Sequence, residues 1–243
     1  MSSATGVPQQ PPPERADDET EPLLGRPGDA SQKPAASVAQ NLILGTGVIA
    51  EAGAILLVAS VWAAVFLHQP LILFSVHPLA QSFGLLALVQ SILIVQPTVT
   101  AEQKKVGQKL HAGLNLVALA SFIVGVVSIE YNKISSGGAH FKSTHAYIGI
   151  VASVWQILQY VVGFTMYGVP QLYGGEAKAK AIWKYHRMSG YGLLLLYMAA
   201  VASATQTDYN NNVLGLKLWA MIVIVLLIVV GIFPRIKKQK LGL

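Results

Sequence analysis

The sequence contains no cysteine and carries little charge. Among its 243 residues there is no Cys, and Asp, Glu, Lys and Arg together make up only 12%, against about 25% in an ordinary soluble domain. The absence of thiols excludes disulfide scaffolds, thiolate metal sites, iron–sulfur clusters and haem attached through thioether bonds. With 53% hydrophobic residues and a mean hydropathy of +0.52, the composition excludes an ordinary soluble protein.

Long apolar stretches follow one another beyond residue 40. Each is long enough, at about 1.5 Å per residue, to cross a hydrocarbon layer of about 30 Å. Because the connections are short, consecutive helices are expected to be antiparallel neighbours. The pattern predicts an all-α membrane protein with six transmembrane helices, at residues 42–67, 71–96, 110–130, 144–169, 188–207 and 213–234.

The chain divides into three predicted regions. Residues 1–40 are rich in Pro, Gln, Ser and acidic groups and poor in large apolar side chains, which predicts a disordered tail. Residues 41–236 form the six-helix domain, and residues 237–243 form a basic end. If the tail is inside, all but three of the 17 Lys and Arg residues also lie inside, so the positive-inside rule places both termini in the cytoplasm. The basic stretches are thus membrane-facing loops, and no nucleic-acid partner is expected.

Four of the six histidines lie in register along the predicted spans. His77, His111, His145 and His186 stand near the starts of spans two to five, at spacings of 34, 34 and 41 residues. Because successive helices run in opposite directions, these starts alternate between the two membrane faces. The histidines therefore sort into an outer pair, His77 with His145, and an inner pair, His111 with His186. Ionisable side chains within membrane spans are costly and usually functional.

Two imidazoles that face each other across a helical bundle are the ligand set of a six-coordinate haem, which passes electrons because its iron has no free position. With no cysteine to attach it, such a haem must be b-type. The sequence therefore predicts two haem b groups in the four-helix core of spans two to five. His77 and His145 would bind the outer iron, and His111 and His186 the inner iron.

Small residues share helical faces with three of these histidines. Gly84, Gly149 and Gly190 follow them by four or seven residues, which places each glycine on the ligand face. A missing side chain there would leave space for a flat macrocycle. Close packing between transmembrane helices explains the same glycines equally well.

Around these histidines the sequence resembles the cytochrome b561 family of transmembrane electron carriers. The resemblance covers about residues 71–191, and its motifs are residues 73–79 (LFSVHPL), 109–115 (KLHAGLN), 140–149 (HFKSTHAYIG) and 183–190 (WKYHRMSG). The absence of any fused domain is similar to the short members that consist of the b561 core only. Two features depart from the family. Residues 94–97 (IVQP) replace an arginine and a tyrosine that many members carry, and Lys133 stands about where some members have an outer histidine.

The resemblance implies a transmembrane ascorbate-dependent oxidoreductase. Six helices and two b haems ligated by the four histidines would carry electrons from cytoplasmic ascorbate to an acceptor on the other side. Acceptors in the family include ferric complexes and monodehydroascorbate, and some members are therefore ferric reductases. Members often form homodimers.

Cationic side chains flank the inner histidines and would concentrate an anionic reductant such as ascorbate. Lys104 and Lys109 are the preferred candidates, because similar members place basic residues there. The positive-inside rule predicts the same lysines with no substrate at all. On the outer side, His140 lies in a loop, where it is either a contact for substrate or metal or an ordinary solvated histidine.

Three further features stand outside the predicted site. Glu51 lies about ten residues into the first span, where a carboxyl group hydrogen-bonded to a neighbour is the economical interpretation. His68 at the end of that span has no assigned role. In the tail, Glu19 precedes Leu23 and Leu24 in a pattern that resembles adaptor-read signals for vacuolar or endolysosomal delivery, although so short a pattern also recurs by chance.

Two rival functions remain open. One is a proton-coupled transporter or channel that uses the histidines as a proton relay without haem. The other is a structural or regulatory membrane protein without chemistry. Neither requires the imidazoles to pair, and both predict a colourless purified protein.

Overall fold

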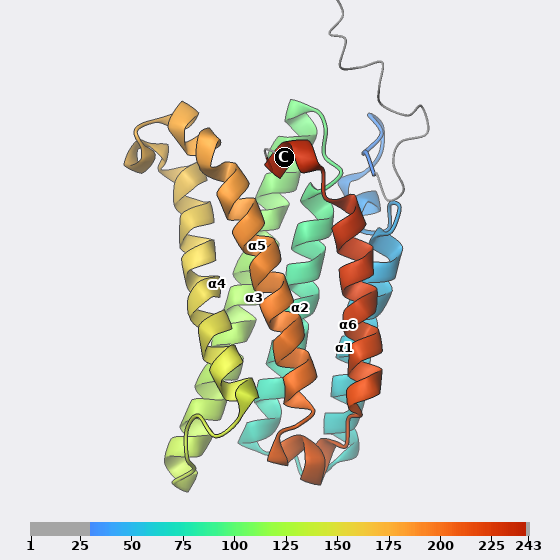
Figure 1. The fold of residues 1–243 in the computed structure, drawn as a ribbon, viewed down its shortest axis with the longest axis vertical. Coiled ribbons are helices and arrows are strands. Elements are labelled where there is room, and N and C mark those ends of the chain that lie inside the picture. Colours follow the sequence, from blue (N-terminus) through green and yellow to red (C-terminus); the bar gives the residue numbers. More distant parts are fainter. Residues whose placement is uncertain (1–29, 242–243) are drawn as a thin grey trace, which may run out of the picture.

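The computed structural model describes residues 30–241, and within this range the chain is helical and contains no strand. Figure 1 shows long helices that run side by side along one axis. The α-helices are α1 (Gly47–Leu67), α2 (Leu73–Val95), α3 (Ala101–Ser136), α4 (Thr144–Gly168), α5 (Glu176–Ala204) and α6 (Leu218–Ile232). Short 3₁₀ or π turns are η1 (Val38–Leu42), η2 (Pro170–Tyr173), η3 (Asn210–Leu214), η4 (Phe233–Arg235) and η5 (Lys238–Leu241). Helix α2 packs along α3, α1 along α6, and α4 along α5.

Helices α3 and α5 begin earlier than the apolar pattern predicted. Helix α3 starts at Ala101 instead of residue 110, because Thr100 and Gln103 form a capping box: the Thr100 hydroxyl accepts from the Gln103 backbone N–H, and the Gln103 side chain accepts from the Thr100 N–H. Helix α5 starts at Glu176 instead of residue 188, directly after two glycines with positive φ. The inner histidines therefore lie well inside their helices and not near the starts.

The N-terminal part of the described chain is held against one end of the bundle. The Gln32 backbone N–H donates to the carbonyl of Pro97, and the Asn41 side chain donates to the carbonyl of Ile94. Buried Arg235 donates to the carbonyls of Asn41 and Leu93. Residues 30–40 were predicted to belong to the disordered tail, but Gln32 in this stretch is hydrogen-bonded to Pro97, just after α2, and to the buried side chain of Asn41. Residues 1–29, which form the rest of the predicted tail, lie outside the described residues.

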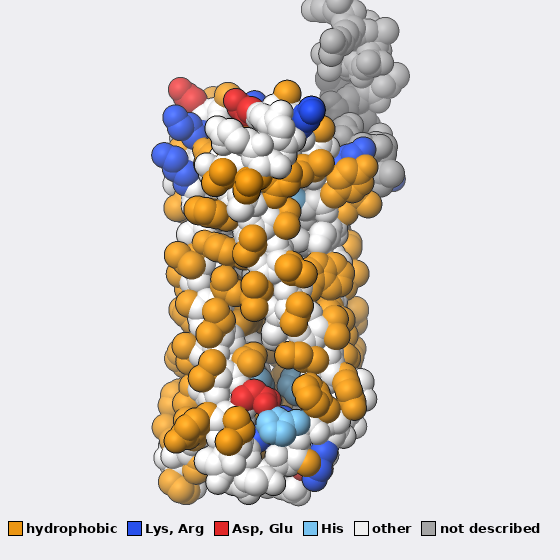
Figure 2. Space-filling model, turned by 90° about the vertical axis from the view of Figure 1, so that its left-hand side faces the viewer, with side chains coloured by type: hydrophobic (Ala, Val, Ile, Leu, Met, Phe, Trp, Pro, Cys, Tyr) orange, Lys and Arg blue, Asp and Glu red, His pale blue; other side chains and the backbone are white. Residues whose placement is uncertain are grey.

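The surface is that of a protein embedded in a membrane. In Figure 2, hydrophobic side chains cover the middle of the visible face, and charged side chains gather at its two ends. Four of the helices, α1 to α4, and the segment Leu218–Arg235 are long and apolar enough to cross a membrane. Helix α5 differs because five charged residues lie in its first twelve positions, and only residues 188–204 are free of charge.

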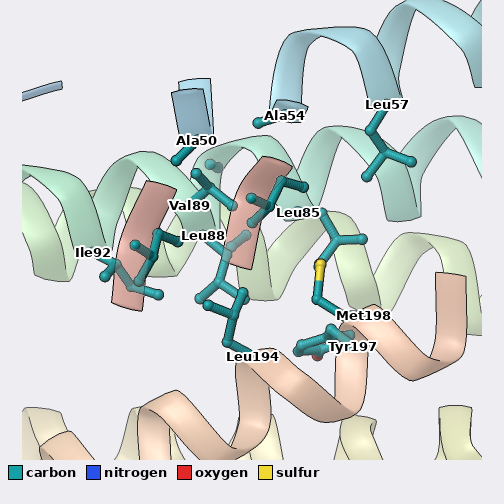
Figure 3. Close-up of a cluster of buried hydrophobic side chains, with 14 of the residues drawn as sticks. Ala50, Ala54, Leu57, Leu85, Leu88, Val89, Ile92, Leu194, Tyr197 and Met198 are labelled. Carbon is teal, nitrogen blue, oxygen red and sulfur yellow. The ribbon is translucent and has the colours of Figure 1, made fainter. Parts of the chain in front are cut away.

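The hydrophobic core draws little on α4, which contributes Ala152 and the partly buried Trp155. Figure 3 shows its centre, where side chains of α1, α2 and α5 interdigitate. Residues of α6 complete this core from the side of α1. By contrast, in an apolar stretch of 18 residues taken from each helix, 11% is buried in α4 and 22% in α3, against 50% in α2. Half of the bundle is thus held by apolar packing, and the half that contains α3 and α4 is more open.

Close packing of α6 on α1 generates a stability prediction. A Cβ atom at Gly231 would meet the backbone nitrogen of Ala50 and lie 2.7 Å from its Cα. Gly231→Ala should therefore push the two helices apart and cost about 1–3 kcal/mol, measured as a lower unfolding midpoint of the detergent-solubilised protein. Gly113→Ala is the control, because a Cβ at Gly113 meets nothing within 4 Å. Equal midpoints for the two variants would contradict the packing described.

Candidate functional site: two histidine pairs

The structure brings four histidines together as two pairs. His77 of α2 faces His145 of α4, with 6.0 Å between the ring centroids. His111 of α3 faces His186 of α5, with 6.5 Å between the centroids. In both pairs the ring planes are nearly perpendicular, at 83°. Each pair therefore joins two helices that are not consecutive in the chain, as the alternation of helix direction predicted.

Hydrogen bonds across helices orient three of the four imidazoles. The Nδ1 atoms of these histidines lie within 3.0 Å of a backbone carbonyl oxygen on a neighbouring helix. His77 contacts the carbonyl of Gly125, His111 that of Ser91, and His145 that of Ala200. A carbonyl can only accept, so Nδ1 carries the proton and donates. The lone pair of Nε2 is then available to a metal ion, as in most metal-binding histidines.

A common spacing relates these contacts. On α2, α3 and α5, the carbonyl that binds a histidine of another helix lies 14 residues after the helix's own histidine: Ser91 after His77, Gly125 after His111, and Ala200 after His186. Fourteen residues rise about 21 Å along an α-helix. Each of these helices therefore touches both pairs, and the two pairs form layers about 20 Å apart along the bundle axis.

Amide side chains support the same helix contacts. Gln81, one turn after His77, donates to the carbonyl of Phe122 on α3. Asn115, one turn after His111, donates to the hydroxyl of Ser91, and its nitrogen lies 3.3 Å and 3.4 Å from the two ring nitrogens of His111. Gln81 thus ties the ligand-bearing turn of α2 to α3, and Asn115 ties the ligand-bearing turn of α3 to α2.

The three glycines on the histidine faces have different surroundings. A Cβ at Gly84 would come within 2.6 Å of the Phe122 ring, so Gly84 serves close packing of α2 on α3. At Gly190 it would lie 3.1 Å from the amide of Gln159, which occupies the space expected for a macrocycle. Only at Gly149, one turn after His145, does a Cβ meet nothing within 4 Å. Of the three, Gly149 alone leaves open space beside a histidine.

The donor set and its geometry fit haem better than a directly bound metal ion. Within residues 30–241, no group of three or more His, Asp or Glu side chains is arranged to hold a metal. Two imidazole–metal bonds of about 2 Å each, with the radii of the two rings, place the centroids of axial ligands roughly 6 Å apart. The observed separations of 6.0 and 6.5 Å match this value. A porphyrin would supply the remaining four ligands.

The outer loop residue His140 lies beside charged residues of α3. Its Nδ1 is 2.7 Å from Glu130, which also lies 3.6 Å from Lys133. His140 and Glu130 are exposed by 38% and 42%. Figure 2 shows acidic, basic and histidine side chains gathered at this end of the molecule. The structure thus makes His140 part of an accessible charged cluster.

The two candidate lysines at the inner end lie on one continuous helix with His111, because α3 begins at Ala101. Lys104 precedes His111 by seven residues and shares its helical face. Lys109 precedes it by two residues, which is about 200° around the helix. The two lysines are therefore not equivalent, and only Lys104 projects from the side of α3 that carries the ligand.

Glu51 and His68 are held by neighbours within the fold. The Gln90 amide of α2 donates to Glu51 at 2.7 Å, in agreement with the hydrogen-bonded carboxyl group that the sequence suggested. His68 ends α1, and its Nδ1 contacts the carbonyl of Ala64. Neither residue belongs to a histidine pair.

Comparison with known proteins identifies the family. The family described as eukaryotic cytochrome b561 matches residues 76–211, which is 136 of 243 residues and includes all four paired histidines. The chain belongs to the cytochrome b561 family. As the name of the family states, its members are b-type cytochromes, which hold haem without a thioether link. The lack of cysteine agrees with this cofactor.

Curated relatives in the family come from animals and plants. The chain is 28% identical over 223 residues to the transmembrane ascorbate-dependent reductase CYB561 of Ovis aries, covering 83% of this chain and 86% of the relative. It is 26% identical over 133 residues to the ascorbate-specific transmembrane electron transporter 2 of Zea mays, covering 55% and 54%. It is 30% identical over 134 residues to the plasma membrane ascorbate-dependent reductase CYBRD1 of Mus musculus, covering 54% and 44%. The chain is accordingly a transmembrane oxidoreductase of the b561 type.

Sequence reasoning missed the residues that hold the histidines in place. The carbonyls of Ser91, Gly125 and Ala200 carry no side-chain signal, because any residue supplies a backbone oxygen. What these positions share is a small residue, which allows helices to approach closely. A search for small residues at a fixed offset from each histidine would have found them.

Proposed function

We propose that the protein transfers electrons across its membrane, with two b-type haems as the carriers, from an anionic reductant such as ascorbate to a ferric complex or monodehydroascorbate. The pairing of four imidazoles at two depths carries this proposal. His77 and His145 would bind the outer haem iron, and His111 and His186 the inner haem iron.

The polypeptide orients three of the four ligands, His77, His111 and His145, before any metal binds. The carbonyl contacts fix which nitrogen is protonated and hold the ring at one rotation, so binding requires little reorganisation. A bis-imidazole iron has no open position, which favours electron transfer over oxygen chemistry. The two layers, about 20 Å apart, span most of the hydrocarbon thickness of about 30 Å. Two such centres would divide the crossing into short steps.

The end of the bundle nearer His111 and His186 is assigned to the cytoplasm. The N-terminal segment, the α2–α3 connection and the C-terminal residues meet there through hydrogen bonds, for example Gln103 to Gln32 and Lys237 to Ser31. The α4–α5 connection lies at the same end (Figure 1). Most Lys and Arg residues lie in these segments, and the positive-inside rule then places them in the cytoplasm. In this orientation α5 is the sixth membrane crossing.

Each end offers charged residues to a substrate. At the inner end, Lys104 lies on the His111 face and would attract ascorbate, which is the substrate named for the curated relatives. At the outer end, His140 and Glu130 together present both a nitrogen and carboxylate oxygens, which are ligand types suited to a ferric complex. Lys133 in the same cluster would instead favour an anionic acceptor.

A visible spectrum tests the haem assignment. The purified protein from haem-replete expression should show the α band of low-spin b-type haem after reduction with dithionite. His111→Ala should remove the inner haem and His145→Ala the outer one, because each pair loses an axial ligand. Pyridine haemochrome analysis should then give half of the wild-type haem in either variant. A colourless wild-type protein would favour the proton-coupled transporter or channel.

Steady-state kinetics test the inner substrate site. Lys104→Ala should raise the KM for ascorbate several-fold, because a cation is lost on the ligand face, and the effect should diminish at high ionic strength. Lys109→Ala is the matched control, since it removes the same charge from a different face of α3. Equal KM values in both variants would mean that only the general positive charge of this end matters.

The organelle is inferred from the tail alone. We propose delivery to a vacuolar or endolysosomal membrane through Leu23 and Leu24, which lie outside the described residues. A full-length Leu23→Ala/Leu24→Ala variant, followed by fluorescence microscopy, should move from that compartment to another membrane. Unchanged localisation would remove the signal from consideration.

A further inference from the structure

His186 is held differently from the other three paired histidines. Its Nδ1 is buried and has no hydrogen-bond partner among the described residues, whereas the other three have a backbone carbonyl. The spacing found on α2, α3 and α5 points to the position on α4 that should supply this partner. Fourteen residues after His145 stands Gln159, where the other helices have the small residues Ser91, Gly125 and Ala200.

The side chain of Gln159 contacts the main chain of His186 instead of its ring. The Gln159 amide donates to the carbonyl of His186 at 2.7 Å. Gly190 lies one turn after His186, and a Cβ there would come within 3.1 Å of the Gln159 nitrogen. The glycine therefore leaves the His186 carbonyl accessible to Gln159. This bond fixes the depth of the ligand-bearing turn of α5 relative to α4.

The ring of His186 lies against the backbone of α4 at Gly163. A Cβ at Gly163 would be 2.7 Å from Cε1 of His186, 3.3 Å from Nε2 and 3.5 Å from Nδ1. All three contacts are with atoms of the imidazole and none with the backbone of α5. A side chain at residue 163 would therefore displace or rotate the ring without having to separate the two helices.

These contacts belong to one stripe along α4. Trp155, Gln159 and Gly163 are four residues apart and share a helical face. The indole of Trp155 donates to the hydroxyl of Ser189 at 2.8 Å. Successive turns of α4 thus contact α5 at His186 and in the turn that follows it, and they set the rotation of that helix.

We propose that Gln159 and Gly163 are positioning residues for His186, and that they replace the carbonyl contact that orients the other three ligands. Gln159 holds the main chain of the ligand, and Gly163 provides the surface on which its ring rests. Together they set the nearly perpendicular orientation of the His186 and His111 rings. The inference rests on the proposed function, in which these two histidines bind the inner haem.

Electron paramagnetic resonance of the oxidised full-length protein tests the inference. When two axial imidazoles are perpendicular, the iron d orbitals that interact with them stay close in energy, and the ferric signal is strongly anisotropic. The wild-type protein should show such a signal for both centres. Gly163→Ala should rotate His186 and shift the inner signal toward lower anisotropy, while the outer signal stays unchanged. The signal that disappears in His111→Ala identifies the inner centre.

Gly168→Ala is the matched control on the same helix. A Cβ at Gly168 would meet only the Phe164 ring, at 3.7 Å and beyond, so both signals should remain those of the wild type. Gln159→Leu keeps a similar volume but removes the donor, and it should shift the inner signal alone. The midpoint potential of the inner centre should change with the signal in both Gly163→Ala and Gln159→Leu.

The outcomes separate this inference from the proposed function. If the wild-type protein shows no low-spin ferric haem signal, the proposed function fails. If the wild type shows both signals and neither Gly163→Ala nor Gln159→Leu alters the inner one, the positioning role alone is overturned. A loss of both signals together in Gly163→Ala, with a lower unfolding midpoint, would assign Gly163 to general helix packing and also overturn it.

Discussion

The arrangement depends on the approach of one helix backbone to the imidazole of another. A helical carbonyl already accepts a bond from its own helix, so a second donor can reach it only where no large side chain covers it. Ser91, Gly125 and Ala200 satisfy this requirement at three positions. The helices are thereby fixed in rotation and depth at the residues that carry the ligands. Apolar packing alone, which is tolerant of sliding, would not fix them so closely.

Two helices of the bundle contribute to its stability without carrying a paired histidine. Helices α1 and α6 hold no paired histidine, yet they complete the apolar core against α2 and α5. Arg235 and Asn41 close the same side at the inner end. The side of α3 and α4 contributes less buried surface and carries half of the paired histidines. A cofactor held by these histidines would cover part of this less buried surface.

The sequence predicted the histidine pairs better than their surroundings. Alternating helix direction is a strong constraint, so the spacing of four histidines was sufficient to sort them into pairs. Helix starts were placed too late because hydropathy reports membrane depth and not hydrogen bonding; the capping box at Thr100 and Gln103 was the available signal. The role of Gln159 could not be predicted, because it depends on which side of α4 faces α5. Gly84 and Gly190 illustrate the same limit, since their neighbours come from other helices.

Helix α3 is long enough to extend from one membrane surface to the other. Its 36 residues extend about 54 Å, well beyond the hydrocarbon layer, so both of its ends stand in water. The same helix carries Lys104 near one end and Glu130 near the other, and it contacts both histidine pairs between them. A change in the tilt of α3 would therefore move residues in contact with both histidine pairs together.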